Sequence, residues 1–229
     1  MKSIHTPSNT AIVLLGGGHV TPASVGELPA ASLVIAADSG AHHAEVLGLP
    51  VHVVVGDLDS VNRTALDALS ALGAEVVSHP VDKNETDAEL ALLHAAGSRV
   101  TRVVIVGAGG GRLDHQLSLF ALLFHDCLRG LEVEARIGAS RTYPLRSGES
   151  RAVSCRDGDV VGLIPFGGDA HGITTRGLQW PLNNESLVVT ASRGVSNRAT
   201  STEFHVSLRE GRLLVTIDRP DHSGEKSGE

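Results

Sequence analysis

Two sequence patterns divide this chain, and the change between them near residue 139 limits the folds that it can adopt. Over residues 1–138, short β-branched runs alternate with stretches rich in alanine and leucine. This alternation predicts strand–helix units and a largely parallel sheet. Strands are expected at residues 11–15, 33–36, 51–55, 75–78, 102–106 and 133–137, and helices at 62–72, 86–96 and 113–128.

From residue 139 onward the apolar runs are short, alternate with polar residues and are separated by glycine and asparagine turns. No helical period persists, so this part is expected to form a small antiparallel sandwich or barrel. Strands are expected at residues 150–155, 160–165, 172–175, 186–190, 202–208 and 213–217. We therefore expect an α/β domain over residues 1–138, a β domain over 139–218 and a disordered tail at 219–229.

The negative charge of the chain is concentrated in its first part. Residues 1–138 carry 15 acidic against 8 basic side chains and residues 139–229 carry 11 of each, which gives the net charge of −7. A negative first part disfavours nucleic acid as a partner and favours divalent cations, and through them a phosphorylated small molecule. Aromatic residues make up only 3% of the chain, which also argues against a base-stacking platform.

No segment is predicted to cross a membrane or to direct secretion. The longest apolar runs fall well short of the ~20 residues that a membrane helix needs, and the first ten residues are polar. The two cysteines are too few for a disulfide framework or a zinc ribbon. We therefore expect a cytoplasmic protein without a membrane partner.

Aspartates recur where the predicted parallel strands end. Asp38, Asp57 and Asp59 follow predicted strands. Asp87 begins a predicted helix, and Asp114 follows a later strand. A single aspartate of this kind is most often a cap or a turn residue, but the carboxyl ends of parallel strands lie at one edge of a sheet, where these side chains are expected to converge. Neighbouring carboxylates need a cation between them, and Mg²⁺ prefers a few carboxylates together with phosphate oxygens.

Two glycine-rich segments, Gly16–Gly18 and Gly107–Gly111, follow predicted strands in the same part of the chain. Such segments let backbone N–H groups approach phosphates at the start of a helix. Neither is a P-loop, because no lysine follows a glycine, and neither matches a dinucleotide fingerprint. Arg112, which follows the second segment, is either a phosphate-binding guanidinium or a solvated residue at a helix start.

The remaining candidates are less specific. The 12 histidines show no metal-ligand spacing, and only His115, beside Asp114, is expected at a site. The single tryptophan, Trp180, is either a core residue of the second domain or a plate that stacks on a heteroaromatic ring. The segment Arg193–Asn197 offers polar groups in a turn, or simply forms a polar hairpin.

Several segments, taken together and in this order, resemble the thiamine pyrophosphokinase family. They are Ala37–Ala41, Val55–Ser60, Asp82–Asp87, Gly107–His115, Thr174–Trp180 and Ser196–Asn197. The resemblance implies a Rossmann-like, mostly parallel α/β/α domain that binds ATP, followed by an antiparallel β-sandwich that binds thiamine. It also implies a homodimer with active sites shared between subunits. The reaction would be a Mg²⁺-dependent transfer of the pyrophosphoryl group of ATP to the hydroxyl of thiamine, giving thiamine diphosphate and AMP.

The resemblance also implies roles for individual residues. The carboxylates expected to act in catalysis are Asp57, Asp59, Asp87 and Asp114, of which the first three would also hold Mg²⁺. The residues expected to contact ATP are Gly17, Asp38, Ser39, Gly40, Gly107, Gly110, Gly111, Arg112 and His115. The residues expected to contact thiamine are Trp180, which would stack on a ring, Ser196 and Asn197.

Two departures from the family pattern concern the phosphate site. Asn84 stands where the family often has aspartate, and Leu117–Leu119 stand where an asparagine often follows. One alternative is a related diphosphokinase with a hydroxymethylpterin acceptor, which would share the ATP-side aspartates. A second is a non-catalytic thiamine- or nucleotide-binding regulator, for which Asn84 is the sole support. No ligand spacing supports a zinc hydrolase.

Overall fold

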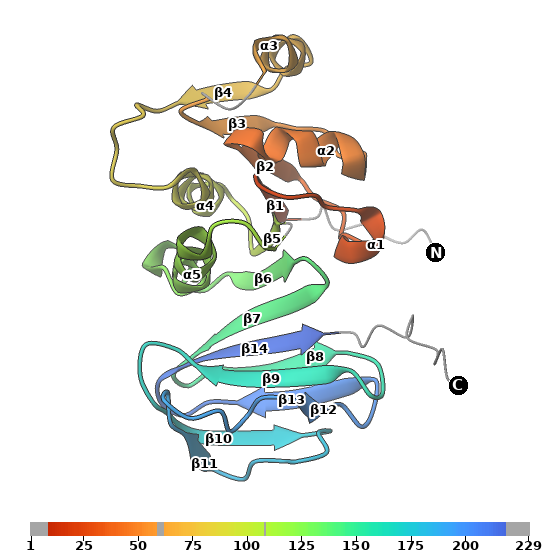
Figure 1. Ribbon diagram of the computed structural model, residues 1–229, viewed down its shortest axis with the longest axis vertical. Helices are drawn as coiled ribbons and strands as arrows, with labels where there is room; N and C mark the ends of the chain where they lie inside the picture. The colour runs from red at the N-terminus through yellow and green to blue at the C-terminus, as the bar shows by residue number, and fades with distance from the viewer. Residues whose placement is uncertain (1–8, 59–61, 108, 219–229) are drawn as a thin grey trace, which may run out of the picture. The chain divides into compact units, whose positions relative to one another are not determined.

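The structure of the protein is a computed structural model, which describes residues 9–58, 62–107 and 109–218. The chain divides into two units, residues 1–138 and 139–229. Helices and a parallel sheet make up the first unit, and antiparallel strands make up the second (Figure 1). The predicted fold class, a parallel α/β domain followed by an antiparallel β domain, is confirmed.

Among the described residues, six parallel strands form the sheet of the first unit. They are β1 (Thr10–Leu15), β2 (Leu33–Ala37), β3 (Val53–Gly56), β4 (Glu75–Ser78), β5 (Arg102–Gly107) and β6 (Glu132–Ile137). Their order is β6-β5-β1-β2-β3-β4, and each neighbouring pair is parallel. From β1 the chain adds β2, β3 and β4 on one side of the sheet, and it then adds β5 and β6 on the other side of β1. The carboxyl ends of β1 and β5 therefore form the topological switch point, where open parallel sheets bind ligands.

Helices connect these strands on both faces of the sheet. They are α1 (Pro22–Val25), the 3₁₀ turn η1 (Asp38–Gly40), α2 (Ala41–Leu47), α3 (Arg63–Ala71), α4 (Asp87–Gly97), α5 (Leu113–Leu122) and the 3₁₀ turn η2 (Asp126–Leu128). Figure 1 shows α1 and α2 on one side of the sheet and α4 and α5 on the other. Right-handed crossovers require this arrangement, because the chain reverses its direction along the sheet after β4. In the part of the chain that the structure describes, no helix is long and apolar enough to span a bilayer.

Local capping decides where helices begin and end. Thr86 caps α4, because its hydroxyl accepts a hydrogen bond from the Glu89 amide at 3.2 Å. The helix expected at residues 113–128 is shorter in the structure, where α5 gives way to η2. At that point the ring of His125 accepts a hydrogen bond from the Cys127 amide at 3.2 Å. A side-chain cap thus starts a new turn where the apolar pattern alone suggested a continuous helix.

The second unit contains two antiparallel sheets, with strand orders β12-β9-β14-β7 and β11-β10-β13-β8. The strands are β7 (Ser140–Arg146), β8 (Ser150–Ser154), β9 (Val160–Pro165), β10 (Ala170–Arg176), β11 (Glu185–Leu187), β12 (Asn197–Arg198), β13 (Glu203–Ser207) and β14 (Arg212–Asp218). The sequence pattern predicted each of these strands except β7 and β12.

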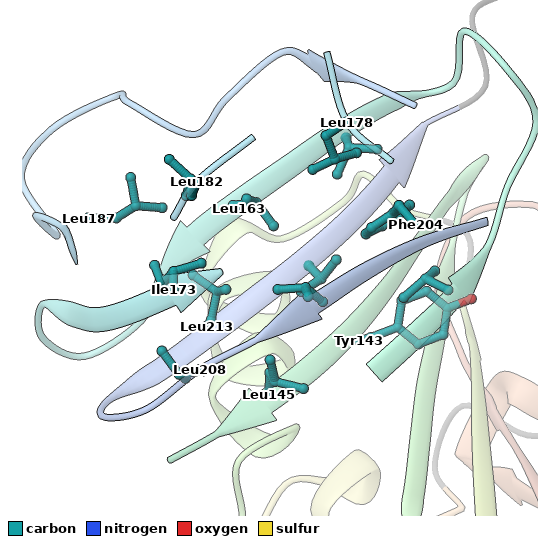
Figure 2. Packing of buried hydrophobic residues seen from close by; sticks show 14 of the residues in the cluster. Tyr143, Leu145, Leu163, Ile173, Leu178, Leu182, Leu187, Phe204, Leu208 and Leu213 are labelled. Carbon is teal, nitrogen blue, oxygen red and sulfur yellow. The ribbon is translucent and has the colours of Figure 1, made fainter. Parts of the chain in front are cut away.

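One apolar core joins the two sheets of the second unit (Figure 2). Leu163 and Leu213 enter it from one sheet, and Ile173 and Phe204 enter it from the other. All four side chains are completely buried. Burying each of them contributes about 1.5–3 kcal/mol relative to exposure. The alternation of apolar and polar residues along each strand therefore becomes a sandwich with an apolar interior.

A buried ion-pair network ties β5 and β6 to the segment that follows β1. Glu134 is 2% exposed and accepts hydrogen bonds from Arg136 Nε and Arg102 Nη2, both at 2.7 Å. Arg136 also donates to the carbonyls of Val25 at 3.1 Å and Glu27 at 2.6 Å. Burial by itself would raise the pKa of Glu134, but the charges and hydrogen bonds of Arg136 and Arg102 lower it below its ordinary value. Glu134 is therefore an ionised carboxylate in the interior.

We expect Glu134→Gln to lower the free energy of unfolding by about 3–5 kcal/mol at neutral pH, because two arginines lose their buried partner. A carboxylate with a lowered native pKa stabilises the fold above its unfolded pKa and loses that contribution as the pH falls through the native pKa. The gap in stability between wild type and variant should therefore shrink in acid. Urea unfolding measured from neutral to acidic pH tests this, and a gap that is constant with pH would contradict it.

Candidate functional site

A cavity of about 600 Å³ lies in the first unit, at the carboxyl ends of the parallel strands. The ends of β1, β2, β3 and β5 and the first turns of α4 and α5 contribute to its wall. It therefore lies at the switch point between β1 and β5. The predicted site residues that line it are Gly17, Asp38, Ser39, Asp57, Asp87, Gly107, Gly110, Gly111, Arg112 and His115.

The segment after β5 gives the cavity a wall of backbone. Gly109, Gly110 and Gly111 have φ angles of +69°, +77° and +79°, which glycine adopts without strain. Arg112 then stands at the N-cap of α5, and its side chain makes no capping hydrogen bond. The Arg112 side chain therefore does not block the first turn of α5, where N–H groups can approach an anion in the cavity, although the His115 amide interacts with the Asp114 carboxylate.

The backbone is strained where β2 and β3 end. Asp38 and Leu58 have left-handed φ angles of +46° and +63°, a conformation that costs about 1–3 kcal/mol for a residue with a side chain. Both Asp38 and Asp57 line the cavity. A Cβ on Gly56 would lie 3.1 Å from Asp87 Oδ1 and 3.2 Å from the Asp38 Cβ. The absence of a side chain at Gly56 therefore lets two acidic segments approach each other over the end of β3.

A lysine joins two of the carboxylates. Lys83 Nζ lies 3.2 Å from Asp57 Oδ2 and 2.9 Å from Asp87 Oδ1, and the lysine side chain is 11% exposed. Burial by itself would lower the pKa of Lys83, but hydrogen bonds and charge attraction to Asp87 and Asp57 raise it above its ordinary value. Lys83 is therefore an ammonium group that two carboxylates from separate segments share.

Arg112 and Asp114 form a bidentate ion pair beside the cavity. The distances are 2.6 Å from Nη2 to Oδ2 and 3.2 Å from Nε to Oδ1. The hydrogen bond lowers the pKa of Asp114 and raises that of Arg112. Arg112 lines the cavity, whereas Asp114 is not part of its wall and is 64% exposed. The pair orients the guanidinium, and an anion in the cavity would compete with Asp114 for it.

Gly40 is predicted at the site but is not part of the cavity wall. Gly40 is buried, and a Cβ there would meet the carbonyl oxygen of Leu14 at 2.1 Å, so glycine is required for η1 to pack on β1. A Cβ on Gly16 would likewise lie 2.1 Å from Ser39 Oγ. Asp59 lies outside the described residues.

The sequence pattern did not identify Lys83, Gly56 or Gln116, although Lys83 and Gln116 line the cavity. The position of Lys83 four residues before Asp87 was the available signal, because both flank the start of a predicted helix. Gly56 directly precedes Asp57 and carried no signal of its own.

The donor groups around Lys83 fit a divalent metal ion. Both carboxylates face the same ammonium, and Mg²⁺ prefers carboxylate oxygens of this kind as ligands. Among the residues that the structure describes, no group of three or more histidine, cysteine, aspartate or glutamate side chains forms a metal cluster. Asp57 and Asp87 therefore suit an ion whose other ligands come from water, phosphate or a residue outside the described ranges.

In the second unit, Trp180 is 56% exposed and is not a core residue. Its backbone N–H donates to Asn197 Oδ1 at 3.1 Å, and Asn197 Nδ2 donates to its carbonyl at 2.8 Å. Asn197 itself is 5% exposed, whereas its neighbour Ser196 is exposed and has a left-handed φ of +63°. The structure thus brings the predicted residues Trp180, Ser196 and Asn197 together. Asn197 fixes the backbone that carries the indole ring, and the exposed ring can stack on a flat ligand.

Comparison with known families finds two matches. Residues 27–134 match the family described as thiamin pyrophosphokinase, catalytic domain, and residues 149–213 match thiamin pyrophosphokinase, vitamin B1 binding domain.

Individual relatives carry the same name. The thiamine pyrophosphokinase of Bacillus subtilis (strain 168) is 24% identical over 204 residues, which cover 89% of this chain and 95% of that protein. Thiamine pyrophosphokinase 3 of Oryza sativa subsp. japonica is 31% identical over 195 residues, covering 75% of this chain and 67% of that protein. Thiamine pyrophosphokinase 1 of Arabidopsis thaliana is 30% identical over 182 residues, covering 72% of this chain and 64% of that protein. The crystal structure of the Bacillus subtilis protein has a TM-score of 0.79 at 24% identity, over 91% of this chain and 98% of that one, and thus has the same fold.

We expect Asn197→Ala to lower the free energy of unfolding by about 1–3 kcal/mol, because the backbone groups of Trp180 lose their partner. Urea unfolding followed by tryptophan fluorescence measures the effect without a label, since the chain contains one tryptophan. Asn183→Ala, at an exposed position, is the matched control. Equal stabilities of the two variants would show that the Asn197 amide does not hold the Trp180 segment.

Proposed function

The chain belongs to the thiamine pyrophosphokinase family, and from this premise we propose that it transfers the pyrophosphoryl group of ATP to the hydroxyl of thiamine. The products are thiamine diphosphate and AMP, so the enzyme is a transferase of diphosphate groups. The observation that carries the proposal is the cavity at the switch point, where a glycine-rich wall, an arginine and a cation-binding carboxylate pair meet. We assign the nucleotide to the first unit and thiamine to the second.

The cavity suits the phosphates of a nucleotide. Its volume of about 600 Å³ falls within the range of small-molecule sites. The backbone at Gly109–Gly111 and the start of α5 offer N–H groups, and Arg112 offers a planar fork of donors. An anion of high charge is the ligand that these groups recognise together.

We further propose Mg²⁺ as the metal, held by Asp57 and Asp87, with Asp59 as the third carboxylate implied by the sequence. When bound, the ion would neutralise charge on the ATP phosphates. Asn84, where the family often has aspartate, is not part of the cavity wall, so Asp57 and Asp87 would supply the charge for the ion.

The reaction depends on positioning and charge neutralisation more than on covalent catalysis. The thiamine hydroxyl oxygen forms a bond to the β-phosphorus, the bond from that phosphorus to the oxygen bridging to the α-phosphate breaks, and AMP leaves. Arg112 and the N–H groups of residues 109–111 stabilise negative charge on the moving group. A carboxylate, Asp87 or Asp114, accepts the hydroxyl proton.

Trp180 is proposed to stack on a thiamine ring, with Ser196 beside it.

We also propose that the chain works in the cytoplasm as a homodimer in which each active site contains residues from both subunits. Light scattering in the presence of both substrates measures the oligomeric state, and a stable monomer would remove the shared site.

We expect the purified protein to convert ATP and thiamine to equimolar AMP and thiamine diphosphate in the presence of Mg²⁺, and EDTA to abolish the reaction. Asp57→Asn should lower turnover roughly 100-fold or more, because it removes a charged group that organises the phosphates. Mass spectrometry of the products measures both effects.

Asp126→Asn is the matched control, since this carboxylate is 79% exposed and pairs with Arg129 away from the cavity. Near-normal turnover of Asp57→Asn at limiting Mg²⁺ would contradict its role. Thiamine binding without product would favour the regulatory alternative, and product with a hydroxymethylpterin in place of thiamine would favour the other diphosphokinase.

We expect Trp180→Ala to weaken thiamine binding roughly tenfold, because a stacked ring loses its partner, and to leave ATP binding nearly unchanged. Isothermal titration with each substrate measures the two affinities. Trp180→Phe should retain most of the thiamine affinity, since it keeps an aromatic face. Equal losses for thiamine and ATP would refute the stacking role.

A further inference from the structure

The carboxylate pair of the cavity is already bridged by a side chain of the protein itself. Lys83 stands on the irregular segment between β4 and α4, with its ammonium 3.2 Å from Asp57 and 2.9 Å from Asp87. Its side chain is 11% exposed, and those of Asp57 and Asp87 are 15% and 27% exposed. The three side chains are therefore mostly buried in the wall of the cavity, where their charges interact more strongly than in bulk water.

Asp57 and Asp87 come from different parts of the chain, at the end of β3 and the start of α4. Two partly buried carboxylates repel each other unless a cation lies between them. The positive end of the α4 dipole favours Asp87 but does not reach a bridging position. Lys83 supplies the bridging charge, so the pair is held together in the protein alone.

A metal ion bound to the same carboxylates would lie near the Lys83 ammonium, and the two cations would repel each other. The lysine head group sits on a flexible chain of four carbons, so it can move without a change of backbone. Lys83 lines the same cavity as Arg112 and the glycine segment proposed for the phosphates. A phosphate oxygen is therefore the anion within its reach.

We propose that the Lys83 ammonium is the cation of this site before the metal binds, and that it then holds Asp57 and Asp87 close to each other. When the metal binds, the ammonium moves to a nucleotide phosphate. This positioning role rests on the proposed function, because it requires a metal on the carboxylates and a phosphorylated ligand in the cavity. Lys83 thus opposes metal binding in the free protein and favours nucleotide binding in the loaded one.

The test uses Mn²⁺ as the probe, because free and bound Mn²⁺ are distinguished by electron paramagnetic resonance. Lys83→Met removes the charge and keeps the length of the chain. Without nucleotide, it should bind Mn²⁺ roughly tenfold more tightly than wild type. With Mn²⁺ present, its affinity for ATP should fall roughly tenfold. Lys83→Arg keeps the charge and should resemble wild type in Mn²⁺ binding.

Arg129→Met is the matched control, because it removes one positive charge from an exposed pair of the same unit. It should change neither affinity. Thermal unfolding provides a second readout, since a ligand of the native state raises the melting temperature. Lys83→Met should melt below wild type without metal and gain more than wild type when Mn²⁺ is added.

The variant Asp57→Asn distinguishes the proposed role of Lys83 from the proposed metal site itself. Loss of Mn²⁺ binding in this variant, together with tighter binding in Lys83→Met, supports the role of Lys83. Weakened binding in Asp57→Asn with unchanged binding in Lys83→Met overturns that role and leaves the proposed metal site intact. Absence of Mn²⁺ binding in every form, or binding that Asp57→Asn does not weaken, overturns both.

Discussion

Parallel strands bring all their carboxyl ends to one edge of a sheet, and in the first unit this edge carries the cavity of the candidate site. The glycine segments follow β1 and β5, and the aspartates follow β2 and β3. Acidic groups that are distant in the sequence are thereby concentrated in a small volume. Such a concentration is stable only with a counter-charge, and the Lys83 ammonium provides it. The strand direction thus determines the electrostatics of the cavity.

The parallel strands of the first unit and the helices α3 and α4 were predictable because the period of the apolar residues indicates them directly, whereas the short helices α1 and α2 were not predicted. The boundary of α5 was not predictable either, because the His125 cap overrides an apolar pattern that continues to Leu128. The strand β12 is too short for any period to indicate it. Local side-chain hydrogen bonds and short elements are therefore where sequence patterns carry least information.

The aspartates of the cavity were predictable because Asp38 and Asp57 follow recognisable strands and Asp87 begins a recognisable helix, whereas the use of Lys83 and Gly56 depends on contacts between segments. Gly56 matters through the side chains of Asp38 and Asp87, which no local pattern brings together. The exposure of Trp180 could not be decided from the sequence either, because the choice between core and surface rests on its pairing with Asn197. The sequence thus identified most of the residues of the candidate site, whereas the contacts that hold their side chains became evident only in the structure.

The approach of Gly16 to Ser39 constrains how this chain can vary. The two residues follow neighbouring strands, and a side chain at position 16 would overlap the hydroxyl at position 39. The two positions are thus coupled, because a larger residue at position 16 requires the Ser39 hydroxyl to turn to another rotamer or residue 39 to become smaller. Combinatorial libraries that vary positions 16 and 39 together should therefore accept larger residues at position 16 more often than libraries that vary position 16 alone.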